Sequence, residues 1–291
     1  MTQTVRGTKQ GGSIPDRLPP ARLLDHDSAP RRITDIPNEV MTTGFELVEC
    51  LNAAARAEGQ LGSVAQFDNL ATHAQYRIPY EIAARYIARG SEVLDWGCGN
   101  GHFSLLLEHL GARVTGYSFE PAPSILRDSR TFRFVAGSES DPRAIPFPDG
   151  TFDAVCSVGV LEHVWETGGT ESGSLAEITR VLRPGGTFLT FHLPNRRGWV
   201  EPAFRSLGVG TYFHRRRYDE SAIRDLWGGA GLEVMEIGTY NLLPRNLLHS
   251  LPGLVRRSAW FARGYDAVDA ALASLLGRYA TNFFVVARRR A

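Results

Sequence analysis

Hydrophobic residues follow a helical period in the first part of the chain and a strand period further on. From residue 39 to about residue 90, apolar side chains recur every three to five positions, as at Val40, Phe45 and Val48. This spacing predicts helices that precede the main fold. Residues 1–38 carry five prolines and several glycines without any period, and we expect a flexible tail there.

Seven short runs rich in β-branched and aromatic residues come next, separated mostly by stretches with a helical period. These runs are 92–96, 113–117, 132–136, 152–158, 187–192, 232–237 and 282–287. Strands that alternate with helices in this way predict a mostly parallel sheet wrapped by helices. We therefore expect an α/β domain over residues 91–291.

Two segments between the predicted elements are too long for plain connections. Residues 196–218 are rich in arginine and aromatic side chains, and we interpret them as a lid that binds the substrate. Residues 241–279 carry apolar residues at helical spacing among several arginines, which indicates one or two amphipathic helices. Core packing or dimerisation is the favoured explanation of that apolar face, ahead of contact with an anionic membrane surface.

Composition and charge exclude several classes of protein. Of the 291 residues 43% are apolar, enough for one large core, and the formal charge of +1 gives no reason to expect a nucleic-acid partner. Three scattered cysteines supply neither a disulfide framework nor a four-ligand zinc site. The N-terminus lacks the apolar stretch of a signal peptide, and no apolar run of about 18 residues follows. We expect a cytoplasmic protein.

The strongest chemical signal is the turn after the first predicted strand, GCGNG at residues 97–101. Glycines there let a ligand approach the backbone, and the start of the following helix favours a negative group. The spacing is GxGxG rather than GxGxxG, which disfavours a nicotinamide dinucleotide. An acid inside the strand, Asp95, suits a cationic ammonium or sulfonium better than a pyrophosphate.

The segment VLDWGCGNGHFS resembles the first motif of class I S-adenosylmethionine-dependent methyltransferases, and IPFPDGTFDAVCSVGVLEHV and ITRVLRPGGTFLTFHLPN are similar to segments that follow it. The resemblance runs from about Val93 to Asn195. It implies a Rossmann-like, seven-stranded sheet with an antiparallel last strand and S-adenosylmethionine as cofactor. It also implies methyl transfer to a small-molecule acceptor, and an oxygen nucleophile on a sugar, nucleotide or natural-product intermediate is the first expectation.

Carried over residue by residue, the resemblance implies a cofactor site at the ends of the first strands. The methionine portion would lie among residues 95–99, and Leu161 and Glu162 would lie on the sulfonium side. The usual ribose-binding acid is replaced by Ser118, and Glu120 is the expected substitute because side chains alternate along a strand. The expected cofactor-binding residues are Asp95, Gly97, Cys98, Gly99, Ser118, Phe119, Glu120, Ser138 and Leu161.

Two histidines are expected near the transferred methyl group. His163 follows the fourth strand and His192 ends the fifth, and either imidazole could take the acceptor's proton because it titrates near neutral pH. Glu162 and His163 could also bind a metal together with His192. Adjacent positions in one loop are poor ligand spacing, however, so we expect no metal.

Within the lid, an acceptor carrying phosphate or carboxylate would meet several arginines and rings, and a solvated arginine cluster is an equal alternative. The expected substrate-binding residues are Arg196, Tyr212, His214 and Arg215. Two other functions remain open. The displaced ribose acid is compatible with a non-catalytic scaffold or regulator of the same fold, and a nicotinamide-dependent oxidoreductase is the less favoured alternative.

Overall fold

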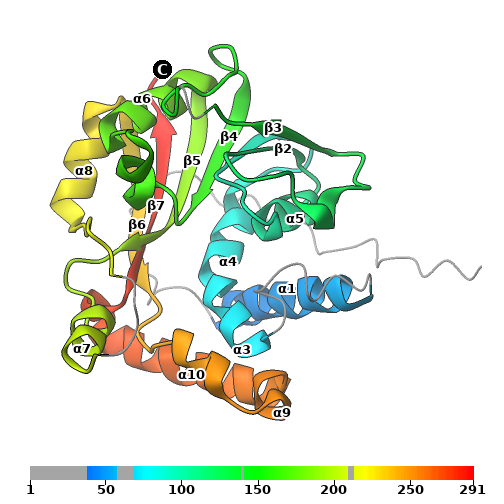
Figure 1. Cartoon of the computed structure of the whole chain (residues 1–291), viewed down its shortest axis with the longest axis vertical. Coiled ribbons are helices and arrows are strands. Elements are labelled where there is room, and N and C mark those ends of the chain that lie inside the picture. Colours follow the sequence, from blue (N-terminus) through cyan, green and yellow to red (C-terminus); the bar gives the residue numbers. More distant parts are fainter. Residues whose placement is uncertain (1–37, 58–68, 139–140, 209–212) are drawn as a thin grey trace, which may run out of the picture.

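The computed structural model describes residues 38–57, 69–138, 141–208 and 213–291. In this part of the chain a seven-stranded sheet has the order β3-β2-β1-β4-β5-β7-β6 (Figure 1). The strands are β1 (Glu92–Trp96), β2 (Arg113–Ser118), β3 (Phe132–Ala136), β4 (Phe152–Val158), β5 (Leu182–Pro194), β6 (Leu232–Tyr240) and β7 (Asn282–Arg289). Six strands share one direction, and β7 runs antiparallel to β5 and β6. The predicted Rossmann-like sheet is confirmed.

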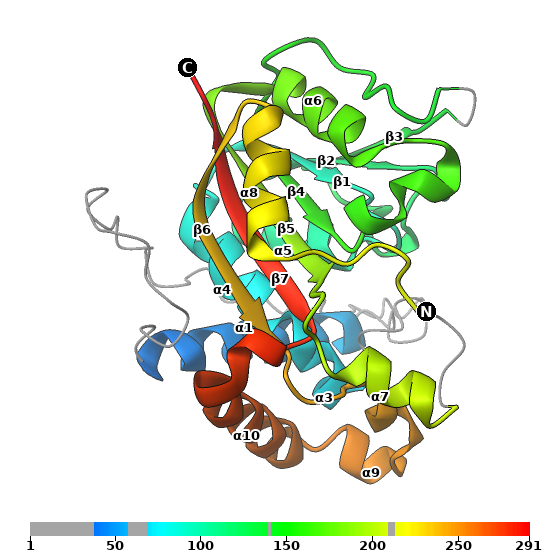
Figure 2. The ribbon, with the colours of Figure 1, turned by 90° about the vertical axis from the view of Figure 1, so that its left-hand side faces the viewer.

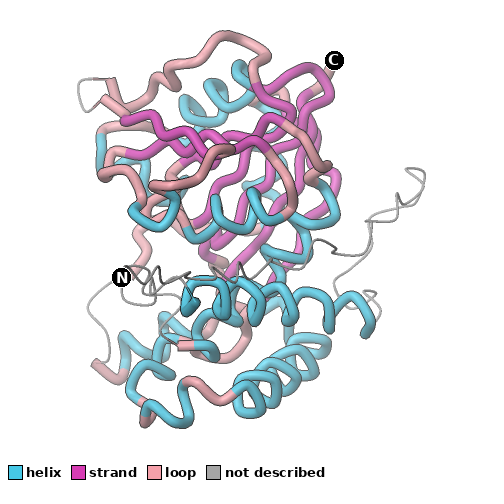
Figure 3. Tube along the Cα trace, turned by 90° about the vertical axis from the view of Figure 1, so that its right-hand side faces the viewer, coloured by secondary structure: helices cyan, strands magenta, loops and turns pink. Residues whose placement is uncertain are grey.

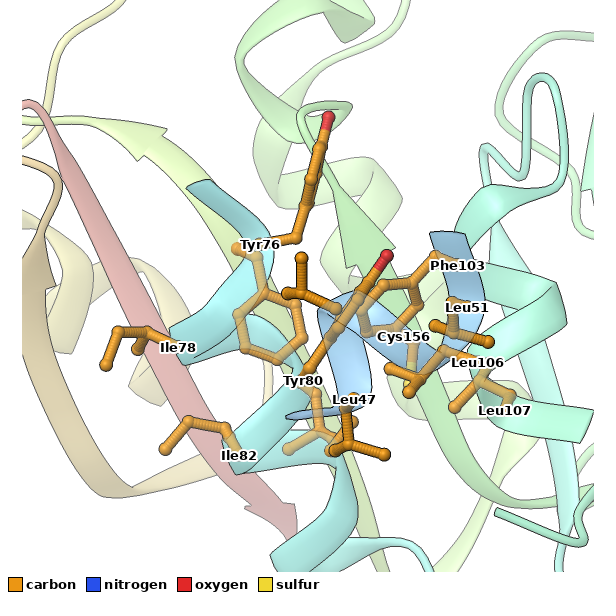
Figure 4. Close-up of a cluster of buried hydrophobic side chains, with 14 of the residues drawn as sticks. Leu47, Leu51, Tyr76, Ile78, Tyr80, Ile82, Phe103, Leu106, Leu107 and Cys156 are labelled. Carbon is orange, nitrogen blue, oxygen red and sulfur yellow. The ribbon is translucent and has the colours of Figure 1, made fainter. Parts of the chain in front are cut away.

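Helices cover both faces of the sheet, and each face has its own core. On one face lie α4 (Arg77–Tyr86) and α5 (His102–His109), and α1 (Asn38–Ala57) packs against α4 below the sheet. On the other face lie α6 (Glu171–Val181) and α8 (Glu220–Gly229) (Figure 2). Figure 4 shows the first core, where Tyr80 and Phe103 pack near Cys156 of β4. Burial of these large side chains fixes the helices that flank the first strand.

A second layer of helices lies beyond the ends of β5 and β6 (Figure 3). It contains α3 (Leu70–His73), α7 (Val200–Ser206), α9 (Gly253–Arg256) and α10 (Ala259–Leu276). Short 3-10 helices complete the connections: η2 (Ala74–Tyr76), η3 (Ser124–Leu126), η4 (Leu161–Thr167), η5 (Asn246–Ser250) and η6 (Gly277–Tyr279). The predicted tail lies outside the described residues apart from Asn38, where α1 begins.

Buried ion pairs join the N-terminal helices to α10. Arg77 of α4 pairs with Glu81 at 2.8 Å and with Asp266 of α10 at 2.6 Å. Arg245 pairs with the same Asp266 at 2.5 Å and with Asp269 at 3.1 Å. Burying these charges is tolerable because each has a partner. The network holds η2, which directly precedes α4, in a fixed place relative to the sheet.

The inner face of α10 mixes polar and apolar residues, because Phe261 and Tyr265 pack against the core beside the buried aspartates. The helix turns Ala262, Asp266 and Asp269 inward, whereas Trp260 is 85% exposed and Leu275 is 83% exposed. Core packing is therefore confirmed for part of the apolar face, and the exposed apolar residues of α10 leave dimerisation a prediction. None of the described helices is long and apolar enough to cross a bilayer.

Candidate functional site

The glycine turn folds back over the second strand. The backbone N–H groups of Gly97 and Cys98 both donate to the carbonyl oxygen of Tyr117, at 2.7 and 3.1 Å. Gly97 has a φ of +79°, and a Cβ at this position would overlap the Val160 side chain. Only glycine satisfies both requirements. The turn therefore exposes bare backbone at the carboxyl edge of β1.

Asp95 connects this turn to the helix that follows. Its carboxylate accepts a hydrogen bond from the Ser104 hydroxyl of α5 at 2.5 Å, and the residue is only 1% exposed. Burial raises the pKa of Asp95 to about 6, although the hydrogen bonds from Ser104 act in the opposite direction. The ionised carboxylate of Asp95 is thus buried directly before the glycine turn, at a cost in folding stability.

Glu120 comes close to the same turn. Its backbone N–H donates to the Ser118 hydroxyl at 3.1 Å, and its carboxylate Oε2 lies 3.8 Å from the place where a Cβ on Gly99 would stand. The exposed ring of Phe119 packs over Gly137, where a Cβ would lie only 2.6 Å from the ring. The structure therefore brings Ser118, Phe119 and Glu120 to the mouth of the turn.

The other two expected cofactor residues lie in different surroundings. Leu161 is fully buried where η4 begins, directly after β4. Ser138 is exposed after β3, and its carbonyl oxygen accepts from the backbone N–H of Asp141 at 3.2 Å. Ser138 stands where the family resemblance implies an acid that contacts adenine, and Asp141 or Glu139 could compensate in this loop; Glu139 lies outside the described residues. Leu161 can thus shape the site by packing, whereas Ser138 stands at its open rim.

His192 occupies an irregular position in β5. The pairing of β5 with β7 shifts register between Thr190 and Leu193, and His192 has a φ of +60°, which is unusual for a residue with a Cβ. Its backbone N–H donates to the Tyr240 hydroxyl at 2.8 Å. Strained bulges of this kind redirect a side chain and occur next to functional sites.

Two tyrosine rings flank this imidazole, and one of them also contacts the His102 ring. The Tyr76 ring of η2 lies 5.0 Å from the His192 ring and 4.4 Å from the His102 ring, and the Tyr240 ring lies 5.6 Å from His192. Nε2 of His192 and of His102 is buried without a hydrogen-bond partner among the described residues. Burial lowers the pKa of His192 to about 4 and that of His102 to about 3. Both rings are therefore neutral near pH 7.

A second group of titratable side chains lies at η4. Ligand-type atoms of Glu162, His163 and His214 all lie within 4.8 Å of one another. Glu162 is only 3% exposed, and burial raises its pKa to about 8. The sequence grouped Glu162 and His163 with His192, whereas the structure places His214 of the lid beside them.

The lid residues divide between two environments. The Arg215 guanidinium lies 4.8 Å from the centre of the Trp165 ring, and Trp165, Arg215 and Arg216 line a cavity of about 390 Å³. Arg196 is instead paired with Asp219 at 2.8 Å on an exposed surface. Tyr212 lies outside the described residues.

Sequence reasoning missed three side chains of this region. Tyr76 and Tyr240 contribute rings to the His192 pocket, and Glu201 of α7 pairs with His214. Tyr76 belongs to a helical segment with no chemical motif, and Tyr240 ends a strand as many aromatic residues do. His102, where α5 begins, is only 7% exposed, and its ring lies 4.4 Å from the Tyr76 ring. These residues share the site only through the tertiary fold.

Comparisons with known proteins match part of this chain to methyltransferases. Residues 94–190 match a family model described as a methyltransferase domain. A probable S-adenosylmethionine-dependent methyltransferase of Mycolicibacterium smegmatis is 29% identical over 160 residues, 55% of this chain and 58% of the relative. A ubiquinone biosynthesis O-methyltransferase of Xanthomonas campestris is 33% identical over 117 residues, 38% of this chain and 46% of the relative. The chain therefore spans about half the length of these curated relatives.

Among solved structures, the fold is similar to that of a methyltransferase from Haloferax volcanii, described in complex with the Trm112 methyltransferase activator. The TM-score is 0.54 at 18% identity, and the alignment covers 84% of this chain and 98% of the other. At that identity the likeness shows the fold alone. The region matched by the family model begins in β1 and contains the glycine turn and most of β5. Residues 94–190 thus match the methyltransferase domain family, and the similarity of the chain to S-adenosylmethionine-dependent methyltransferases supports S-adenosylmethionine as its cofactor.

Proposed function

We propose that the chain transfers a methyl group from S-adenosylmethionine to an oxygen atom of a small-molecule acceptor. The observation that carries this proposal is the place of His192. A strained bulge holds its imidazole in a pocket of aromatic rings, and His102 of the same pocket directly follows the glycine turn. A cofactor cradle and a proton acceptor thus lie side by side.

The residues at the turn fit the cofactor. Gly97 and Gly99 leave the backbone bare, and the Asp95 carboxylate supplies negative charge for the cationic methionine portion. The Glu120 carboxylate at Gly99 would accept hydrogen bonds from the ribose hydroxyls, and the exposed Phe119 ring offers a face on which adenine would stack. Each contact uses a group that the chain already holds at this edge.

When bound, S-adenosylmethionine supplies a methyl group on a positively charged sulfur that is already electrophilic. The protein must then align the acceptor, exclude water and remove one proton. His192 takes the hydroxyl proton of the acceptor at Nε2, which is buried and neutral near pH 7. The amide nitrogen of Asn282 lies 3.1 Å from Nδ1 of His192. The reaction requires the amide group turned by 180°, so that its oxygen accepts the Nδ1 proton and the lone pair lies on Nε2.

The pocket favours a planar acceptor. Tyr76, His102 and Tyr240 present rings around His192, and such rings bind a flat molecule through stacking and edge contacts. The relative from Xanthomonas campestris is named for O-methylation in ubiquinone biosynthesis, which agrees with a ring-bearing acceptor. Arg215 next to the Trp165 ring would bind an anionic substituent of the acceptor.

Substitution of His192 by asparagine tests the proposal. Asparagine accepts a positive φ and keeps the bulge, but it cannot act as a base. We expect kcat for release of S-adenosylhomocysteine to fall about 100-fold or more with phenol and catechol acceptors, while the affinity for S-adenosylmethionine is unchanged. His109→Asn, at the end of α5 and outside the pocket, is the matched control.

The outcome also separates this proposal from a scaffold or regulator of the same fold. Unchanged turnover in His192→Asn would remove this residue as the base. Cofactor binding without turnover of phenol, catechol or sugar hydroxyls in the wild-type chain would favour the non-catalytic function.

A further inference from the structure

The group at η4 has the composition of a metal site. Glu162, His163 and His214 offer one carboxylate oxygen and two imidazole nitrogens, all within 4.8 Å of one another. Nε2 of His163 lies 3.9 Å from Oε1 of Glu162. Two of these residues are adjacent in the chain, and the third comes from the lid. The fold of the lid therefore completes a three-ligand set that the sequence does not reveal.

Both imidazoles are oriented by carboxylates outside the group. Nδ1 of His163 lies 2.9 Å from the Glu166 carboxylate, and Nδ1 of His214 is hydrogen-bonded to Glu201. When a carboxylate accepts the Nδ1 proton, the lone pair of the ring lies on Nε2, the atom that would bind a metal. Histidine ligands of metal ions nearly always have such an outer partner.

Glu162 supplies an independent observation. The side chain is almost fully buried, and its Oε2 has no hydrogen-bond partner in the part of the chain that the structure describes. A buried carboxylate oxygen without a partner is costly, and a bound cation would remove that cost. The arginines of the lid are directed elsewhere: Arg217 to Glu201 at 3.7 Å and to backbone carbonyls, and Arg216 to Glu171 at 3.3 Å.

We propose that Glu162, His163 and His214 bind one divalent transition-metal ion. Two imidazoles and one carboxylate suit Zn²⁺ or Co²⁺ better than Mg²⁺, which prefers oxygen ligands. Three protein ligands leave a coordination position open for an oxygen atom of a small molecule. This assignment makes His163 a ligand rather than the base.

The site borders the proposed reaction pocket. A Cβ placed on Gly159 would lie 3.8 Å both from Oε1 of Glu162 and from Cβ of His192, so one glycine separates the two groups. A metal ion at the η4 group would bind a hydroxyl of the acceptor and lower its pKa close to the His192 imidazole. The site itself rests on its ligands and not on the proposed function.

Metal binding by the tag-free, full-length chain tests the inference. The protein is stripped with a chelator, dialysed and titrated with Zn²⁺ by calorimetry, and Co²⁺ is added separately to record its visible absorption. We expect one ion per chain, with intense Co²⁺ bands typical of a tetrahedral site. Glu162→Gln and His214→Ala should each weaken Zn²⁺ binding about 100-fold or more, and Glu201→Gln about 10- to 100-fold.

The matched control is His249→Ala, which removes an exposed histidine of η5 and should leave the single site unchanged. Absence of stoichiometric binding in the wild-type chain would overturn the inference, as would equal Zn²⁺ affinities of wild type, Glu162→Gln and His214→Ala. Circular dichroism confirms that each variant is folded. The wild-type chain is titrated with S-adenosylmethionine in parallel. Absence of cofactor binding there would contradict the proposed methyl transfer but not the proposed metal site.

Discussion

Substitution of Asp95 by asparagine should make the chain more stable and its cofactor binding weaker. The carboxylate is 1% exposed, and burial raises its pKa from 3.8 to about 6. Asparagine has nearly the same shape and can still accept the Ser104 hydrogen bond. The variant therefore removes the buried charge and little else.

The size of the gain follows from the two pKa values. Because the folded-state pKa of Asp95 lies above the unfolded value, the folded chain holds the proton between pH 3.8 and about 6, and its stability falls as the pH rises through that interval. The raised pKa of Asp95, about two units above the unfolded value, lowers the free energy of unfolding by roughly 3 kcal/mol near pH 7.5 and by roughly 1.6 kcal/mol near pH 5. The difference in free energy of unfolding between Asp95→Asn and wild type should therefore increase by about 1.4 kcal/mol from pH 5 to pH 7.5.

Urea unfolding of the cofactor-free chain at both pH values measures this gain. Calorimetry measures the affinity for S-adenosylmethionine. We expect the affinity of Asp95→Asn to be about tenfold lower or more, because the cationic methionine portion loses its counter-charge. Asp153→Asn provides the control, since this acid lies at the amino end of β4, away from the glycine turn. A variant with lower stability at high pH, or with unchanged cofactor affinity, would refute the reasoning about Asp95.

Two further substitutions test the lid and the N-terminal helices. Arg215→Ala should raise KM for an anionic acceptor roughly tenfold without changing cofactor affinity. Arg183→Ala, at the opposite edge of the sheet, is the control and should leave KM unchanged. Equal KM values for the two variants would mean that Arg215 does not bind the acceptor. Arg77→Met removes the ion-pair partner of buried Glu81 and one of the two arginines that pair with Asp266, and it should lower the free energy of unfolding by about 3–5 kcal/mol. Arg224 forms an exposed ion pair with Glu220, so Arg224→Met should lower the free energy of unfolding by about 0.5 kcal/mol or less. Urea unfolding measures both variants, and equal losses would contradict the claim that the buried ion pairs stabilise the fold.

The sheet could be predicted from the sequence because local patterns encode it. Each predicted run overlaps a strand, and β1, β3 and β4 have the predicted bounds. The fifth strand begins earlier than expected, at Leu182 rather than Thr187. Residues 183–186 form an irregular stretch there, with Leu182 paired to Phe152 and Thr187 paired to Ala154. Because Pro-Gly-Gly is typical of a turn, the sequence does not indicate that strand pairing extends back to Leu182.

The aromatic pocket and the η4 group could not be predicted because they depend on long-range contacts. Tyr76 contacts His192 across more than 100 residues of sequence, and the next residue, Arg77, pairs with Asp266 of α10. His214 meets Glu162 only through the path of the lid. The positive φ of His192 arises from the register shift against β7, which no local pattern indicates. Sequence motifs thus located the cofactor edge, whereas tertiary packing decides which side chains share it.

The glycine turn as the cofactor cradle is the central claim, and Gly99→Ala tests it most directly. Gly99 has a φ of +46° and no atom nearer than 3.8 Å to an added Cβ, so the new methyl group would enter only the space assigned to the cofactor. Gly90→Ala is the matched control, with a φ of +82° and nothing within 4 Å, at the amino end of β1. In calorimetry with S-adenosylmethionine, we predict one equivalent bound by wild type and Gly90→Ala and at least about tenfold weaker binding by Gly99→Ala. No binding by the wild-type chain, or equal affinities of the two variants, would contradict the account.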